Sequence, residues 1–366
     1  MIRFTWLSAI ALAVASARAQ TPVAYEHPIP FAPRQYLCYR SPKPIQVDGV
    51  LSDTAWAAAP WTDDFTDIEG SRKPAPPLRT RAKMLWDDEY FYIAAELAEP
   101  HIWANLTQRD AVIFHDDDFE VFIDPDGDGR QYAELEMNAL NTVWDLLLFA
   151  PYHLAETPSY TNHWDIRGLK TAVQLQGTLN RPEDTDAYWR IEIAIPFSVL
   201  TELGSHKGRP QPGEQWRVNF SRVDWQVEPD GNGYRKKTNP ATGRPFPESN
   251  WVWSPTGRID MHRPETWGWV QFSALEGDDG RERFQQRSSH GVAWALWQLF
   301  YAQKLYRQQH GAYATALGQL KIPSVAWPDY TFMPEMRGDG SYFIFRTADA
   351  EGKVWRLGDK GRLESK

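Results

Sequence analysis

The sequence has 366 residues, enough for about two domains of ordinary size. Acidic residues outnumber basic ones by 48 to 39, and the formal net charge is −9. This balance argues against a nucleic-acid-binding protein, because affinity for phosphate needs clustered Lys and Arg side chains. Tryptophan is unusually frequent, with 18 residues, and its flat ring is suited to stacking on sugars and other flat or apolar ligands.

The first segment, 1–19, is typical of a secretory signal. It has a basic Arg3, an apolar run over 4–15 and a small-x-small triplet at 17–19. No later apolar run approaches the ~18 residues that a membrane span needs. We therefore expect a secreted or periplasmic protein that does not span a membrane. The single cysteine, Cys38, excludes an internal disulfide.

The next segments indicate a proline-rich extended leader at 20–38 and a long β-rich domain at 39–275. In the latter, short runs of β-branched and aromatic residues recur between Gly, Pro and Asp clusters, a pattern that favours an antiparallel β-sandwich. One short helix is expected at 197–203, entered through Pro196. The predicted strands cover residues 81–86, 90–97, 118–124, 132–138, 143–149, 188–195, 215–223 and 267–272.

The remaining chain divides into a polar linker at 276–289 and a small C-terminal α+β appendage at 290–366. Apolar residues at helical spacing predict a helix of about twenty residues that ends at Gly311. A short second helix at 313–320 and a hairpin of 342–346 with 353–357 are also expected. The role of this appendage and the oligomeric state are left open.

The hairpin formed by 118–124 and 132–138 carries the most informative pattern. If its loop closes symmetrically, Glu120 pairs with Glu136 and the apolar residues of both strands share one face. Two opposed carboxylates repel each other, so this face needs a cation or a proton. The other, polar face carries Glu120, Asp124, Glu134, Glu136 and Asn138.

A third strand, 216–221, alternates in the same way and places Arg217, Asn219 and Ser221 on its polar face. Arg217 is therefore a candidate counter-charge for the acidic hairpin. Two interpretations stay open for this surface: an acidic face that is merely solvated, or a site for a ligand or cation.

The loop that closes the hairpin starts with Asp124, Asp126 and Asp128 and imitates the first half of an EF-hand calcium loop. The twelfth position is Leu135, where an EF-hand supplies a bidentate Glu. A tight acidic turn and an irregular calcium site both remain open.

Several motifs, taken in order, resemble the family 9 carbohydrate-binding modules and their relatives. The similarity covers about 40–273 and implies an immunoglobulin-like β-sandwich, calcium in some members, and a sugar site on the polar face of one sheet. The motifs lie at residues 47–56, 85–93, 117–124, 189–197, 216–220 and 264–268.

Carried over by motif, the resemblance implies that Glu120 contacts ligand. Phe114 and Met261 fall where the family has stacking tryptophans, and Glu136 falls where it has an arginine. Other tryptophans, Trp144, Trp164, Trp251 and Trp253, are candidates for further stacking platforms. The candidate ligand-binding residues are Phe114, Glu120, Glu136, Asn138, Trp144, Arg217, Asn219, Ser221 and Met261.

Three functions are considered. We predict a secreted, non-catalytic protein that binds an oligo- or polysaccharide in polysaccharide utilisation, with calcium as its candidate cofactor. The alternative is a glycoside hydrolase in which Glu120 and Glu136 form a retaining pair, whose carboxyl groups lie about 5 to 5.5 Å apart. A haem-binding redox module using Met137 with His115 or His262 is the third, by similarity to cytochrome domains of the same superfamily.

Overall fold

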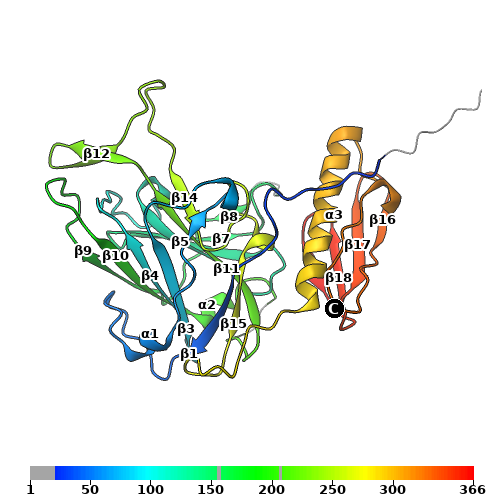
Figure 1. Ribbon diagram of the computed structural model, residues 1–366, viewed down its shortest axis with the longest axis horizontal. Helices are drawn as coiled ribbons and strands as arrows, with labels where there is room; N and C mark the ends of the chain where they lie inside the picture. Colours follow the sequence, from blue (N-terminus) through cyan, green and yellow to red (C-terminus); the bar gives the residue numbers. More distant parts are fainter. Residues whose placement is uncertain (1–20, 155–157, 206–207) are drawn as a thin grey trace, which may run out of the picture.

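The structure is a computed structural model that describes residues 21–154, 158–205 and 208–366, so the predicted signal at 1–19 lies outside the described residues. Figure 1 shows a large β-structure beside a smaller module in which one helix lies on a sheet. No helix in the described part of the chain is long and apolar enough to cross a membrane. The predicted class, an all-β sandwich with a small α+β appendage, is confirmed.

The strands of the large domain form a continuous hydrogen-bonded sheet that folds into two halves around one core. The half that carries the acidic hairpin has the order β8-β7-β6-β5-β11-β15, and β14 and β2 extend it from β11. The bounds of its strands are β2 (Thr66–Asp67), β5 (Asp118–Asp124), β6 (Tyr132–Asn138), β7 (Val143–Leu148), β8 (Tyr160–Thr161), β11 (Gln215–Asp224), β14 (Ser249–Val252) and β15 (Gly268–Phe272).

The second half has the order β1-β3-β4-β10-β9, and β1 joins it to the first half. Strand β1 runs parallel to both of its neighbours, β15 and β3, whereas the other pairings in the two halves are antiparallel. The bounds here are β1 (Gln35–Arg40), β3 (Thr80–Trp86), β4 (Tyr90–Ala98), β9 (Lys170–Gln176) and β10 (Tyr188–Pro196). The short helices α1 (Thr54–Ala58) and α2 (Phe197–Leu200) and a ribbon of β12 (Val227–Asp230) with β13 (Gly233–Lys236) complete the domain.

The register of the acidic hairpin is the predicted one. Glu120 of β5 lies directly opposite Glu136 of β6. Val121 and Leu135 point into the core between the halves, because side chains alternate along each strand. Sliding β5 by one residue would bury the acids in this core, and the hydrophobic pattern therefore fixes the polar face outward.

The C-terminal module consists of α3 (Ser288–His310) and a four-stranded antiparallel sheet. Helix α3 ends at Gly311 with a left-handed φ of 79°, as the glycine stop predicts. The predicted hairpin is present as the pair β17–β18, extended by a strand on each side. These strands are β16 (Glu335–Gly338), β17 (Phe343–Ala348), β18 (Val354–Gly358) and β19 (Leu363–Ser365).

The predicted second helix at 313–320 is wrong. Only a single 3-10 turn, Leu317–Gln319, occurs there. The segment pairs instead with the start of the described chain: the Val23 amide donates to the Gln319 carbonyl, and the Lys321 amide donates to the Val23 carbonyl. These tertiary bonds hold an extended backbone where local propensity favours a helix.

The residues before β1 lie along the C-terminal module rather than apart from the body of the protein (Figure 1). Phe31 stacks on Trp294 of α3 with ring centroids 4.1 Å apart, and Tyr25 contacts Tyr301 at 4.7 Å. The module also contacts the sandwich directly, because the Tyr301 hydroxyl donates to Glu265 at 2.5 Å. The N-terminal segment, the helix and the sandwich thus share one packed interface.

Candidate functional site

A cavity of about 370 Å³ opens over the polar face of β5, β6 and β7. Its floor consists of the carboxylates Glu120, Glu134 and Glu136, which the outward register of the hairpin places there. All three are at least 94% buried, with exposed fractions of 6, 4 and 2%. The volume falls within the range typical of small-molecule sites.

The rest of the cavity is lined by aromatic and aliphatic side chains together with Glu248, Asn250 and Asp260. Trp144 of β7 stands opposite Glu136 in the strand register, and Phe114 lies on a 3-10 turn, Ile113–His115, that precedes β5. Tyr152 and Met261 come from loops that reach the cavity from elsewhere in the sequence. The cavity therefore combines aromatic ring surfaces with a strongly polar floor.

Two buried polar atoms of this cavity have no hydrogen-bond partner. They are the indole Nε1 of Trp144, which is a donor, and Oε2 of Glu134, which is an acceptor. A buried polar atom without a partner costs free energy, so native structures rarely keep one unless a ligand, ion or water meets it. The pair offers a donor and an acceptor to a ligand that has hydroxyl groups.

The floor is electrostatically strained. Burial raises the pKa of Glu120 to about 7, with a further contribution from Glu248, while the Ser221 hydroxyl acts in the opposite direction. Burial and the Glu120 charge raise the pKa of Glu134 well above its ordinary value, and the same causes act on Glu136. The backbone amide of Phe114 donates to Glu136 Oε2 at 3.0 Å and opposes this shift only in part.

One wall carries a neutral histidine. Burial lowers the pKa of His262 to about 4. Its Nδ1 lies 2.9 Å from the Tyr132 hydroxyl, and its ring packs edge-on against Tyr152. Met137, in contrast, lies in the core on the opposite face of β6, and so Met137 and His262 cannot share one haem iron.

The structure brings five of the nine predicted ligand-binding residues together at this cavity. Phe114 and Met261, which were expected to stack on the ligand, both line the wall of the cavity. The five residues are Phe114, Glu120, Glu136, Trp144 and Met261.

The other four predicted residues do not line the cavity. Arg217 does not reach Glu120 or Glu136: it lies opposite Asp124 of the hairpin, and its guanidinium lies 3.6 Å over the Trp269 ring and donates to the Trp267 carbonyl. The Asn219 side-chain amide donates to the Ser254 carbonyl and accepts the Ser254 amide, so it is engaged by the backbone of that loop. Arg217 and Asn219 thus bond to the two ends of the segment 253–267.

Asn138 and Ser221 contribute to the fold and do not line the cavity. Asn138 accepts the amides of Leu140 and Thr142 and so closes the turn after β6. Ser221 is fully buried opposite Glu120.

Three of the tryptophans proposed as extra platforms belong to the core instead. Trp164, Trp251 and Trp253 are between 1 and 7% exposed, and all pack in the main hydrophobic cluster. Trp56 and Trp189 are also buried, Trp189 in the same cluster and Trp56 in a separate one.

Sequence reasoning missed the loop contributions to the cavity. The missed residues are Tyr152, Glu248, Asn250 and Asp260, whereas His262 was considered only as a haem ligand. Each lies outside the predicted strands, and only the register of distant loops could have indicated it. Glu134 was placed on the polar face by alternation and was omitted only from the candidate set.

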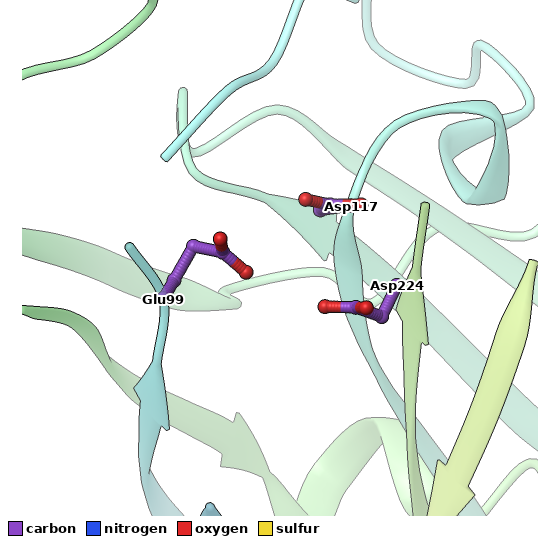
Figure 2. Close-up of side chains that lie close together, drawn as sticks. All are labelled: Glu99, Asp117 and Asp224. Carbon is purple, nitrogen blue, oxygen red and sulfur yellow. The ribbon is translucent and has the colours of Figure 1, made fainter. Parts of the chain in front are cut away.

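A second group of acids lies on the other side of β5. Glu99, Asp117 and Asp224 come from three separate segments and converge, as Figure 2 shows. Arg222 lies among them and pairs with Glu99 at 2.5 Å and Asp224 at 2.7 Å. The Trp225 amide bonds Asp117 at 2.7 Å. This cluster has its own internal cation.

The acidic loop after β5 forms a third group of oxygens, which fits a tight turn. Asp124 accepts the amides of Gly127 and Gly129 at 3.0 and 2.9 Å. Asp128 is paired with Arg362 of the C-terminal module at 2.8 Å. These bonds account for the acids, as the turn interpretation expects, and they engage the oxygens that a calcium ion would need.

Residues 47–270 match the sequence profile of the family described as carbohydrate family 9 binding domain-like. The chain belongs to this family. The match confirms the resemblance found in the sequence motifs and places the protein among carbohydrate-binding domains.

Individual relatives are distant from this family 9-like chain. The exoglucanase XynX of Acetivibrio thermocellus is 26% identical over 122 residues, which are 33% of this chain and 9% of that enzyme. The chain therefore spans less than a tenth of the length of this curated relative.

Two solved structures are similar over about two thirds of the chain. A family 9 module from Caldicellulosiruptor kristjanssonii in complex with cellotriose is 17% identical, covers 69% of this chain and all of its own, and has a TM-score of 0.42. A protein from Bacteroides uniformis is 15% identical over 66% of this chain and all of its own, with a TM-score of 0.48.

Proposed function

We propose that the cavity over β5, β6 and β7 is the saccharide site of this family 9-like domain, and that the protein is exported and acts in polysaccharide utilisation. The observation that carries the proposal is the pairing of aromatic walls with a buried polar floor. Within it, Trp144 offers an unpaired N–H and Glu134 an unpaired oxygen. The membership of the family supports the same assignment.

The chemistry of the walls and floor suits a pyranose ring. The faces of Trp144 and Phe114 can cover the apolar C–H side of a sugar, while hydroxyl groups bond to the carboxylates below. A hydrogen bond to a charged group contributes about 1.5 to 3 kcal/mol. Only a few such bonds are needed for the micromolar to millimolar affinities expected of a shallow aromatic site.

Calorimetry with a panel of gluco-, xylo- and manno-oligosaccharides tests the proposal. We expect saturable binding of at least one of them to the full chain, and at least a tenfold loss of affinity in Trp144→Ala. Trp61→Ala is the matched control, because Trp61 lies under Arg81 and Lys83 outside the cavity. No binding across the panel, or equal losses in both variants, would refute the assignment.

A second substitution tests whether the saccharide contacts the wall that Phe114 forms. Phe114→Trp enlarges the stacking surface and should strengthen binding two- to fivefold. Unchanged affinity would show that the saccharide does not reach Phe114.

Glycoside hydrolysis is the second candidate. It is favoured by the opposed pair Glu120 and Glu136 and by the raised pKa of Glu120, about 7, which suits a general acid. Release of nitrophenol from aryl glycosides by the full chain, abolished in Glu120→Gln, would establish it. Equal release by the chain and this variant would exclude this pair.

A further inference from the structure

The sheet of the C-terminal module has one covered face and one open face. Phe343 and Phe345 of β17 pack in the hydrophobic cluster that includes α3. Side chains alternate along a strand, so Ile344 and Arg346 lie on the opposite face, where Ile344 is 42% exposed. Two hollows lie on this open face, one of about 500 Å³ and one of about 250 Å³. They are neighbours, because Glu335 and Arg346 line both.

Gly358, the last residue of β18, keeps the larger hollow open. It stands opposite Ile344 in the strand register, and both residues line the hollow. Its φ lies outside the left-handed region, so the backbone does not require glycine. A Cβ atom built there would come no closer than 3.7 Å to any atom beyond its neighbours in the chain, which is ordinary contact. The missing side chain therefore leaves space, and glycine in a strand often marks close approach by a ligand.

Four arginines line the larger hollow, and their charges are only partly neutralised. Arg346 of β17 lies directly opposite Arg356 of β18, and like charges in this position destabilise a sheet. Glu335 offsets Arg346 at 3.5 Å. Within the part of the chain that the structure describes, the guanidinium groups of Arg337 and Arg356 have no ion pair and no hydrogen bond. Two guanidinium groups are thus available to a negatively charged ligand.

Acidic and apolar side chains in the same hollows restrict the ligand class. Glu335, Asp359 and Glu364 line the larger hollow together with the arginines. These carboxylates repel a dense polyanion such as a nucleic acid, but they accept hydrogen bonds from hydroxyl groups. Ile344 and, in the smaller hollow, Tyr330 add apolar surface. A uronic acid unit carries the matching groups, because it has one carboxylate, several hydroxyls and an apolar C–H face.

We propose that the open face of the C-terminal sheet binds an oligosaccharide that contains uronic acid, with its carboxylates bonded to Arg337 and Arg356 and a sugar ring over Gly358. Guanidinium groups suit this role because they bond a carboxylate through two parallel N–H donors. The larger hollow has the volume of a typical small-molecule site. The site lies outside the family match at 47–270 and shares no lining residue with the cavity over β5, β6 and β7, so it gives the C-terminal module a binding role of its own.

Calorimetry of the full chain with tetragalacturonate in low-salt buffer tests the proposal. We expect saturable binding that weakens at least tenfold in Gly358→Val, because valine fills the hollow, and at least threefold in Arg337→Ala and in Arg356→Ala. Valine suits a strand, so the Tm of Gly358→Val should not fall. If it does fall, the two arginine variants decide the test. Lys353→Ala is the matched control and should bind as the original chain does, because Lys353 lies over the Trp355 ring in the same module and lines neither hollow.

The chemistry of the ligand and the place of binding are tested separately. The methyl ester of the same oligomer, sodium phosphate and a polyglutamate peptide should each bind at least tenfold more weakly than tetragalacturonate. Trp144→Ala, which changes the cavity over β5, β6 and β7, should bind tetragalacturonate as the original chain does, so a failure of that cavity as a saccharide site leaves this site standing. No binding of tetragalacturonate, equal binding of any comparison probe, or a loss in Trp144→Ala or Lys353→Ala as large as in the arginine variants would overturn the proposal.

Discussion

The two buried acidic clusters on either side of β5 begin at consecutive residues but differ in how their charge is neutralised. Asp117 belongs to the group of acids around Arg222, the Arg222 cluster, and Asp118 lies beside the acids of the cavity floor. Strand β11 alternates beside them, presenting Ser221 to the floor and Arg222 to the other cluster. One step along a strand thus separates acids that have an internal cation from acids that have none.

The difference teaches which cluster holds the fold together and which is available for a ligand. Arg222 is fully buried, lies 5.0 Å over the Trp251 ring and ties β4 to β11 through Glu99 and the Ala98 carbonyl. The cavity floor has no such tie. A buried charge that lacks its partner is costly, so the first cluster should fail when its cation is removed and the second should gain when an acid is removed.

The largest effect is expected for Arg222→Met. It leaves Glu99, Asp117 and Asp224 without their cation and should cost about 3 to 5 kcal/mol of unfolding free energy, measured by urea denaturation. The matched control is Arg235→Met, which breaks the exposed pair with Glu228 and should cost less than about 1 kcal/mol. Similar losses in the two variants would contradict a structural role for the Arg222 cluster.

Stability measured at a series of pH values should detect the proton that Glu99, in the Arg222 cluster, retains in the folded state. Burial, aided by Asp224 and opposed by Arg222, raises the pKa of Glu99 from 4.5 to about 7. Between these values the unfolded chain has released the Glu99 proton and the folded chain retains it, so the stability contribution of this group falls as pH rises and levels off above about 7.

Glu99→Gln removes that titration. Its stability relative to the original chain should improve by on the order of 1 to 3 kcal/mol between pH 4.5 and 7.5. Denaturation curves at four pH values measure the difference between the two proteins, which cancels the other carboxyls. A constant difference across the series would show that Glu99 is ionised throughout.

The smallest expected effects are two changes in unfolding free energy, one in each acidic cluster, that have opposite signs. In chelator at pH 8, Glu136→Gln should stabilise the protein by about 1 kcal/mol, because it removes a charge that faces Glu120. Asp224→Asn should destabilise it by about the same amount, because Arg222 loses an ion-pair partner at 2.7 Å. Changes of the same sign in both variants would erase the distinction between the clusters.

Local patterns were sufficient for the strands of the acidic hairpin and for the face on which the site lies, but they missed β1, which begins inside the predicted leader, and also β9 and β14. The alternation through Phe119, Glu120 and Val121 gave both the bounds of β5 and the side that is buried, because a period of two admits only one register with a dry core. The glycine stop of α3 at Gly311 was equally local. The predicted 313–320 helix failed where a distant strand-like contact decided the conformation.

The rest of the site could not be predicted, because contacts between segments distant in the sequence decide which residues line it. Arg217 alternates onto the polar face as expected, yet Trp269 on the adjacent β15 offers it a ring at 3.6 Å, and the guanidinium stacks there rather than at Glu120. Tyr152 and His262 reach the cavity from loops more than a hundred residues apart. No periodicity encodes such encounters, since they depend on how the loops cross the finished sheet.

The backbone bridge between Val23 and Leu320 joins the start of the described chain to the C-terminal module. About 300 residues separate its partners, so the bridge and the stacking of Phe31 on Trp294 can form only after nearly all of the chain has been synthesised. Until then Tyr25 and Phe31 lack their partners and are available to chaperones or to other chains. Residues 294–320 must therefore be synthesised before Tyr25 and Phe31 can be buried.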